Sequence, residues 1–466
     1  MSIPQGEQQR RISALVQMQR THFKSGLTRS AAWRREKLET VIRMVEENRE
    51  AMHRGLELDL RRNRTDSDLI DVEYTVREAR YALRNLDQWM KPEHEPLSPV
   101  WQPGKVRIRR DPFGVALVIG AWNEPYMLTL GPAIAALAAG NTVVIKPSEV
   151  APNSAEVLAE LVARYFHPSE LAVETGGVDV AEELLEQNWD FIFFTGSPRV
   201  GRIIYAGATR NLTPCVLELG GKNPTIVHSS ADIKVAARRI AFGRFMNAGQ
   251  VCTSPDYVLV LPEVKDQLIH ELGEAIREFY GADPQASPDF GRIVNKANFK
   301  RLQAYLGDGT VVHGGYTDED DLYIAPTIIT EPDLDSALMN EEIFGPILPI
   351  IEIGSIEEAI GWVNARPAPL GLYVFTGEME IAEEILTRTD SGDACVNDAT
   401  VQPMIHELPF GGTGNSGFGK YHGRHGFETF TNARGVFYHS TRVDPAVKYP
   451  PYAKRKAQRA ILTKLL

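Results

Sequence analysis

The feature that most restricts the fold is an alternation of short apolar runs with helix-like segments, which begins near residue 115. The runs VALVIG (115–120), NTVVIKP (141–147) and FIFFTG (191–196) are each followed by a segment with helical spacing. Strands that are apolar on both faces and alternate with helices are typical of parallel sheets covered on both sides. The sequence therefore predicts an α/β chain.

A second series of the same kind begins near Thr213. Its expected strands are CVLELGG (215–221), PTIVH (224–228), YVLVLP (257–262), ILPIIEI (347–353) and GLYVFTG (371–377). Residues 6–92 precede both series and are rich in Arg, Glu, Leu and Ala with helical spacing, which predicts two or three amphipathic helices. We predict two Rossmann-like, doubly wound α/β domains with a boundary near 211–213.

Two further segments resemble exposed strands. In WQPGKVRIRRDPFG (101–114), Val106 and Ile108 alternate with basic residues between two glycines, and RGVFYHS (434–440) is similar in composition. Because exposed strands need a partner, we expect the protein to form an oligomer.

Charge and composition restrict the partners. The formal charge of −11 argues against nucleic acid, which requires a basic surface. No run reaches the roughly 18 apolar residues that a spanning helix needs, and the N-terminus lacks an apolar core of signal-peptide length. With only three cysteines, we expect a cytoplasmic protein. The basic segment 453–466 fits a solvated or surface-docked helix better than a membrane anchor.

Two residues are candidates for chemistry. Cys252 lies in FMNAGQVCTS (245–254), a turn of small residues in which backbone N–H groups can lower the pKa of a thiol. Glu218 lies in the apolar strand VLELGGKNP (216–224), where burial raises a carboxyl pKa and suits a general base. Each also fits a structural role, as a buried small hydrophobe and as a paired carboxylate.

Two strand ends are candidates for binding phosphate or ribose. FFTGSPRVG (193–201) places Gly196 and Gly201 between a strand and a helix, where glycines allow a backbone to approach phosphate. IKPSE (145–149) ends another strand with Lys146 and Glu149, which suit ribose hydroxyls or phosphate. The alternatives are an ordinary strand–helix joint and a surface ion pair.

Taken together, these motifs resemble the aldehyde dehydrogenase superfamily from about residue 10 to about residue 451. The shared motifs are WN (122–123), IKPSE, FTGS with Gly201, LELGGKNP (217–224), GQVC (249–252), EEIFGP (341–346) and LPFGGTGNSG (408–417). RIAFGRFMNAGQVC (239–252), YIAPTI (323–328), LPFGGTGNSGFGKYHG (408–423) and VKYPPY (447–452) resemble the class 3 branch, which includes fatty and aromatic aldehyde dehydrogenases.

The resemblance implies a mechanism. Cys252 attacks the aldehyde as a thiolate, Asn123 and the Cys252 N–H hold the oxyanion, and Glu218 activates the water that hydrolyses the thioester. The implied cofactor residues are Lys146, Glu149, Gly196, Ser197, Gly201, Leu219, Glu342 and Phe344. Glu149 beside a ribose 2′-hydroxyl favours NAD, and NADP stays possible.

The resemblance also implies a domain plan and a homodimer. Residues 1–94 and 113–211 form the NAD(P)-binding domain, 212–400 the catalytic domain, 95–112 and 425–448 the bridging strands, and 449–466 the C-terminal tail. The resemblance further implies that the two exposed strand segments, 101–112 and 434–440, pair across a subunit interface as a small β oligomerisation arm.

The chain departs from the family at Glu124, where an aromatic residue usually follows the oxyanion asparagine. One interpretation places Glu124 at a helix start, beside Pro125 and pointing away from substrate, and this is favoured because buried charges are costly. The other places it in the substrate tunnel, where it selects a cationic or hydroxylated substrate. Thr253 and His406 are further tunnel candidates, and a packing role suits His406 equally well.

No metal is implied. His422 and His425 lack accompanying ligands and are interpreted as surface histidines, while Cys215 and Cys395 are interpreted as structural. The alternative functions are a cofactor-independent cysteine esterase or thioesterase, a CoA-acylating variant, and a binding protein on a retired enzyme scaffold.

Overall fold

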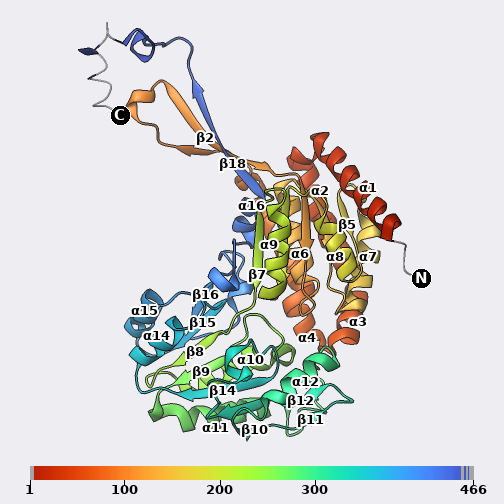
Figure 1. Ribbon diagram of the computed structural model, residues 1–466, viewed down its shortest axis with the longest axis vertical. Helices are drawn as coiled ribbons and strands as arrows, with labels where there is room; N and C mark the ends of the chain where they lie inside the picture. Colours follow the sequence, from red (N-terminus) through yellow and green to blue (C-terminus); the bar gives the residue numbers. More distant parts are fainter. Residues whose placement is uncertain (1–4, 453–455, 458–459, 461–466) are drawn as a thin grey trace.

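The computed structural model describes residues 5–452, 456–457 and 460. It consists of two sheet-centred units and a β arm that projects away from them (Figure 1). Among the described residues, no helix is both long and apolar enough to cross a membrane.

The first unit is built on a six-stranded sheet of order β17-β7-β6-β3-β4-β5. Its strands are β3 (Val115–Ile119), β4 (Thr142–Lys146), β5 (Leu171–Val173), β6 (Phe191–Gly196), β7 (Cys215–Leu219) and β17 (Gly417–Phe418). All pair in parallel except β17, which runs antiparallel to β7. Parallel pairing follows from the helical connections between successive strands.

Helices cover both faces of this sheet. They are α1 (Gln5–Lys24), α2 (Ala31–Glu47), α3 (Arg49–Leu60), α4 (Arg64–Ser67), α5 (Glu73–Trp89), α6 (Met127–Ala139), α7 (Pro152–Tyr165), α8 (Val178–Leu185), α9 (Pro198–Thr209) and α16 (Gly423–Thr429). In β3, Ala116 and Val118 join the core under α2, α5 and α6, whereas Leu117 joins the core on the opposite face. Every residue of α6 is buried, as expected of a helix that is apolar all round.

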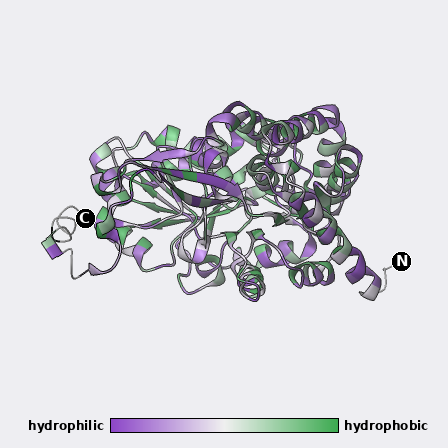
Figure 2. Ribbon diagram, turned by 90° about the horizontal axis from the view of Figure 1, so that it is seen from above, coloured by the Kyte–Doolittle hydropathy of each residue, from purple (hydrophilic) through white to green (hydrophobic). Residues whose placement is uncertain are grey.

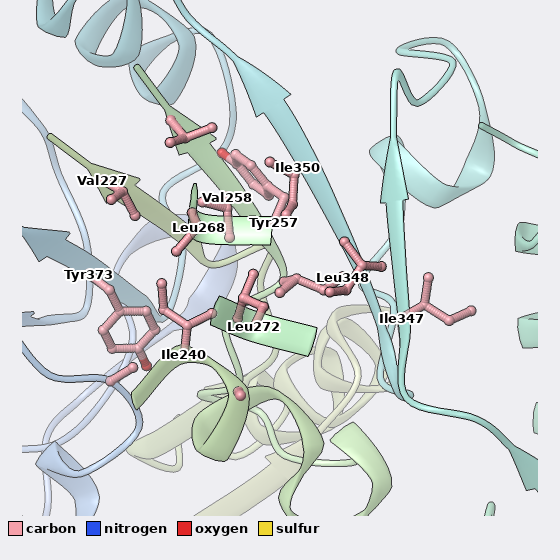
Figure 3. Close-up of a cluster of buried hydrophobic side chains, with 14 of the residues drawn as sticks. Val227, Ile240, Tyr257, Val258, Leu268, Leu272, Ile347, Leu348, Ile350 and Tyr373 are labelled. Atoms are coloured by element: carbon pink, nitrogen blue, oxygen red, sulfur yellow. The ribbon is translucent and has the colours of Figure 1, made fainter. Parts of the chain in front are cut away.

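The second unit contains a seven-stranded sheet of order β10-β13-β14-β9-β8-β15-β16. The strands are β8 (Pro224–Val227), β9 (Tyr257–Val260), β10 (Thr310–His313), β13 (Thr327–Thr330), β14 (Ile347–Glu352), β15 (Gly371–Phe375) and β16 (Asp393–Val396), and β11 (Thr317–Asp318) and β12 (Tyr323–Ile324) form a small separate pair. The helices are α10 (Ile233–Phe245), α11 (Pro262–Tyr280), α12 (Lys296–Tyr305), α13 (Ala337–Asn340), α14 (Ile356–Asn364) and α15 (Met379–Arg388). The core of this unit lies between the sheet and its helices. In it, Val258 and Ile350 of the sheet pack with Leu268 and Leu272 of α11 (Figure 3).

The predicted α/β class is confirmed, and two details differ. The strand β7, Cys215–Leu219, pairs with β6 of the first sheet, so the change from one sheet to the other falls after it, at 220–223, rather than at 211–213. Residues 6–92 hold four helices of at least 12 residues instead of two or three. Gly26 and Arg61 both have positive φ, which ends a helix, and these two breaks divide the segment into more helices than expected.

The β arm consists of β1 (Glu93–Glu95), β2 (Gly104–Pro112) and β18 (Thr431–His439). β2 pairs antiparallel with β18 along its whole length within one chain. The two predicted strand segments therefore pair with each other, whereas we expected them to pair across a subunit interface. The arm strands are largely hydrophilic when seen from above (Figure 2). Most of the tail predicted as a helix, 453–466, lies outside the described residues.

Candidate active site

A cavity of about 640 Å³ lies where the carboxyl ends of β3, β4, β6 and β7 meet the second unit. This is the edge at which open parallel sheets bind ligands, because the loops that follow the strands diverge there. The cavity is lined by the predicted residues Asn123, Lys146, Glu149, Gly196, Ser197, Glu218, Leu219, Cys252, Glu342 and Phe344. Gly201 does not line it; a Cβ there would lie 2.6 Å from the Leu219 side chain, so this glycine lets α9 pack closely on β7.

Cys252 follows α10 and a short 3-10 turn, Met246–Gly249, in which Asn247 and Ala248 have positive φ. The Asn223 side chain donates to the carbonyl oxygens of Cys252 (2.8 Å) and Ser254 (2.9 Å), which fixes the loop. Burial, together with nearby carboxylates of which Glu124 is the strongest, raises the pKa of the Cys252 thiol well above its usual value. Forming the thiolate here therefore requires a base or a neutralised environment.

Asn123 is 2% exposed and has a fixed backbone. Its carbonyl oxygen accepts hydrogen bonds from Arg62 Nη1 and Asn247 Nδ2, each at 3.1 Å. Its side-chain Nδ2 is buried and has no hydrogen-bond partner among the described residues. A buried donor without a partner is costly, which points to a bound acceptor in the working enzyme.

The loop that carries Asn123 rests on a fully buried ion pair. Arg62 Nη2 pairs with Asp71, and neither side chain is exposed. The other Asp71 oxygen accepts from the backbone N–H groups of Tyr126 (2.9 Å) and Met127 (2.7 Å). Asp71 and Arg62 thus hold both ends of the segment 123–127.

Removing one partner of this pair should destabilise the protein strongly. Replacing Arg62 with Met leaves Asp71 buried without a counter-charge, at an expected cost of about 3–5 kcal/mol in the free energy of unfolding. Urea unfolding measures the loss. The matched control is Arg64→Met, which removes an exposed pair with Glu50 and should unfold close to wild type. Equal stability of the two variants would contradict the role of the buried pair.

Glu218 lies in β7, near its end, and is 3% exposed. Neither carboxylate oxygen has a hydrogen-bond partner among the residues described. Burial raises the pKa of Glu218 well above its usual value, Lys420 opposes the shift and Asp393 adds to it. A carboxyl group with a raised pKa is a stronger base than an ordinary glutamate, which suits a general base.

On the cofactor side, β4 ends at Lys146, whose Nζ lies 2.6 Å from Glu149 Oε2. Lys146 is buried and Glu149 is half-exposed at the cavity. Ser197 caps α9 by accepting a hydrogen bond from the N–H of Val200. Both residues line the cavity, so the first turn of α9 faces it. A lysine, a carboxylate and a helix N-terminus in this arrangement suit a ribose and a phosphate.

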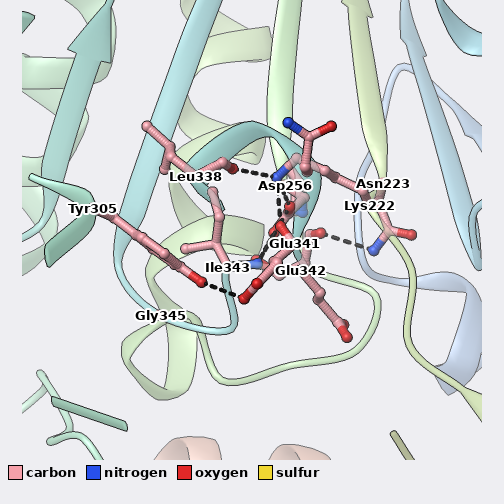
Figure 4. A network of polar contacts seen from close by, with 12 residues as sticks. Lys222, Asn223, Asp256, Tyr305, Leu338, Glu341, Glu342, Ile343 and Gly345 are labelled. Carbon is pink, nitrogen blue, oxygen red and sulfur yellow. Dashed lines mark hydrogen bonds and ion pairs between the residues drawn. The ribbon is translucent and has the colours of Figure 1, made fainter. Parts of the chain in front are cut away.

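The loop with Glu342 and Phe344 is held in place by a polar network around Lys222 and Asp256 (Figure 4). Lys222 Nζ bonds Asp256 Oδ2 (2.6 Å) and the carbonyl oxygens of Leu338 and Glu341, and Asp256 accepts from the N–H of Ile343. This support holds Phe344 with a positive φ of 51° and places it at the cavity.

The cavity fits a dinucleotide. A Cβ at Gly220 would lie 1.9 Å from Glu342 Oε2, so only glycine lets that carboxyl group approach β7. Burial, reinforced by Asp256, raises the pKa of Glu342 to about 8. The polar groups at one end and the apolar wall of Phe344 and Trp122, whose rings meet edge to face, suit ribose, phosphate and a nicotinamide ring.

A second, smaller pocket lies beside Cys252 and contains Glu124 and Thr253. Glu124 sits in the turn before α6, which begins at Met127, and it is 4% exposed. It faces the pocket beside Cys252 rather than solvent, so its role towards substrate stays a prediction. Burial, reinforced by Asp71, raises the pKa of Glu124 to about 8. Thr253 lines the pocket as predicted.

His406 and His422 both pack inside the protein, which is one of the two roles expected of His406 and differs from the surface position expected of His422. His406 lines neither pocket; it pairs with the buried Glu78 and packs against Tyr74 and Tyr81. His422 is buried rather than on the surface, stacked on Phe410, and burial lowers its pKa to about 4. Among the described residues there is no group of three or more His, Cys, Asp or Glu side chains placed to hold a metal ion.

Sequence reasoning missed several lining residues. Tyr421 lines both pockets and its hydroxyl has no partner among the described residues. The only sequence feature that could have pointed to Tyr421 was its place in the GKYHG motif. The others are Met127, Leu128, Met246, Val251, Thr400, Pro403, Met404 and Phe410, which lie far apart in sequence.

Comparison with known proteins decides what kind of site this is. Residues 1–436 match the aldehyde dehydrogenase family. The chain belongs to this family. Human aldehyde dehydrogenase family 3 member B1 is 44% identical over 94% of both chains, and the dog aldehyde dehydrogenase described as dimeric and NADP-preferring is 41% identical over 95% of this chain and 98% of its own. The substrate-bound state of Staphylococcus aureus AldH superposes with a TM-score of 0.94 at 38% identity, covering 99% and 100%.

Family membership confirms the predicted activity and the class 3 resemblance. This aldehyde dehydrogenase oxidises an aldehyde to a carboxylic acid with NAD(P) as cofactor. The cofactor-independent esterase alternative receives no support from these relatives.

Proposed function

We propose that Cys252 is the nucleophile, Asn123 the oxyanion donor and Glu218 the general base of this aldehyde dehydrogenase. The observation that supports this most directly is that all three line one cavity, with the Asn123 amide and both Glu218 oxygens buried and without partners among the described residues. A buried donor that has no partner in the resting protein, such as Asn123 Nδ2, is available to stabilise negative charge that develops only during the reaction.

The steps follow from the chemistry of these groups. Glu218 takes the thiol proton, directly or through water, and the Cys252 sulfur adds to the aldehyde carbon. The oxyanion of the thiohemiacetal accepts hydrogen bonds from Asn123 Nδ2 and the Cys252 N–H. Glu342 and Phe344 would hold a nicotinamide cofactor at this cavity, and that cofactor would supply the acceptor for the hydride of the former aldehyde carbon. Glu218 first releases the thiol proton to solvent and then takes a proton from water, whose oxygen adds to the carbonyl carbon of the Cys252 thioester. The acid leaves, and the Cys252 sulfur departs as a thiolate that takes the proton back from Glu218.

The cofactor residues are proposed from their places in the cavity. Lys146 and Glu149 hold the adenosine ribose, Ser197 and Gly196 lie near the phosphates, and Glu342 and Phe344 hold the nicotinamide ribose and ring, with Leu219 in the wall. Glu149 favours NAD over NADP, since a 2′-phosphate beside its carboxylate is repelled.

We also propose a cytoplasmic homodimer. Support comes from the free Cys215, Cys252 and Cys395, from the exposed aromatic residues Phe437 and Tyr438 on the arm, and from a relative described as dimeric. In this proposal 1–94 and 113–219 form the cofactor-binding domain, the catalytic domain begins after the change of sheet at 220–223 and extends to 400, and 95–112 with 425–448 joins two subunits.

Replacing Asn123 with Ala tests the oxyanion hole. We expect kcat for aldehyde oxidation to fall by roughly 10²–10³-fold, with a much smaller change in cofactor affinity. The measurements are reduced-nicotinamide absorbance and cofactor titration by fluorescence. The matched control is Asn415→Ala, an exposed asparagine that bonds Arg202 at the surface. A kcat for Asn123→Ala within a few-fold of wild type would remove Asn123 from the mechanism.

A further inference from the structure

A buried carboxylate without a partner stands beside the nucleophile. Glu124 lines the pocket next to Cys252, and it is 4% exposed. Its carboxylate makes no hydrogen bond or ion pair with any residue that the structure describes. A buried ionised carboxylate is costly unless a cation or several donors surround it.

The surrounding protein does not supply that cation. Arg62 is the nearby positive charge, but its guanidinium already bonds Asp71 and the carbonyl of Asn123. The titratable and charged groups that act on Glu124, or that it acts on, are Arg62, Asp71, Tyr74, Cys252 and Tyr421. Apart from Arg62 none is a cation, and Arg62 is balanced by Asp71, so the pocket carries a net negative charge when Glu124 is ionised.

The rest of the pocket is apolar and narrow. The volume of the pocket is about 10 Å³, which is enough for a group the size of a water molecule. The other residues that line it include Met127, Met246, Met404 and Phe410. Methionine side chains adjust easily to a ligand, and an aromatic face attracts a cation. A compact cationic group therefore meets complementary charge and complementary walls here.

We propose that Glu124 binds the cationic head group of the substrate, and that the enzyme selects short aldehydes that carry an ammonium group. The proposal rests on the proposed function, because the carbonyl must lie at Cys252 and Asn123 while the head group lies at Glu124. The bound cation also offsets the negative potential that Glu124 imposes on the Cys252 thiolate.

The test compares two short aldehydes of equal length, one ending in methyl and one in ammonium. Wild type should have the higher kcat/KM for the ammonium aldehyde, and Glu124→Gln should reduce that preference by about 30-fold or more. The matched control is Glu357→Gln, the same substitution at an exposed carboxylate that pairs with Arg388 away from the pocket, and it should keep the preference. Because burial raises the pKa of Glu124 to about 8, the wild-type preference should increase from pH 6.5 to 9, and that of Glu124→Gln should not.

Two results would overturn the proposal: an equal preference in wild type and Glu124→Gln, or faster oxidation of the methyl aldehyde by wild type. Calorimetry distinguishes failure of the proposed role of Glu124 from failure of the proposed function. A short alkylammonium ion should bind Cys252→Ala and should not bind Cys252→Ala with Glu124→Gln. If no aldehyde is oxidised, the proposed function fails, and this binding difference still decides the role of Glu124.

Discussion

Cys252→Ala should form no reduced nicotinamide with any aldehyde, a loss on the order of 10⁴-fold or more in kcat. Without the sulfur no thiohemiacetal forms, so the aldehyde carbon never reaches the state from which hydride leaves. The measurement is absorbance of the reduced cofactor at saturating NAD and aldehyde.

The control for this variant is Cys215→Ala. Cys215 begins β7 and is partly buried against the core of the first unit, away from both pockets. The Cys215→Ala variant should therefore oxidise aldehyde at close to the wild-type rate. If Cys252→Ala retained a tenth of wild-type activity with its cofactor binding intact, a different nucleophile would have to be sought.

Glu218→Gln should separate the two halves of the reaction. Glutamine has nearly the same shape but cannot take a proton from water, so steady-state turnover should fall by roughly 10²–10⁴-fold. Part of the first oxidation should survive, and stopped-flow mixing should show a burst of up to one reduced cofactor per subunit. In wild type, kcat should decline as pH falls below the raised pKa of Glu218, because only the carboxylate acts as a base.

The matched control for Glu218→Gln is Glu149→Gln. Glu149 is a carboxylate at the far, cofactor end of the same cavity, so its loss should change the KM for NAD more than the hydrolysis step. A Glu218→Gln variant that turned over at the wild-type rate without a burst would show that water is activated by another group.

Local patterns in the sequence predicted much of this molecule. Buried strands such as VALVIG and FIFFTG are apolar on both faces only in a covered parallel sheet, so the class followed from them directly. Cys252, Glu218 and Asn123 each stand in a short motif, and the cavity does bring all three together. These features depend on neighbours along the chain.

Features set by contacts between distant segments were harder to predict. Glu124 precedes a helix, as one interpretation required, but the turn that carries it is held by the distant Asp71, which accepts hydrogen bonds from the N–H groups of Tyr126 and Met127. His422 is polar and follows a motif rich in glycine, but it is buried by stacking on Phe410. Neither contact leaves a signal in the residues next to it.

The most direct test of the central claim is to find the acyl group on the enzyme. Glu218→Gln is mixed with aldehyde and NAD, quenched in acid within the burst, digested, and analysed by mass spectrometry. We predict an acyl group on the peptide that carries Cys252, formed only when NAD is present. An unmodified Cys252 peptide, or an acyl group on Cys215 or Cys395, would contradict it.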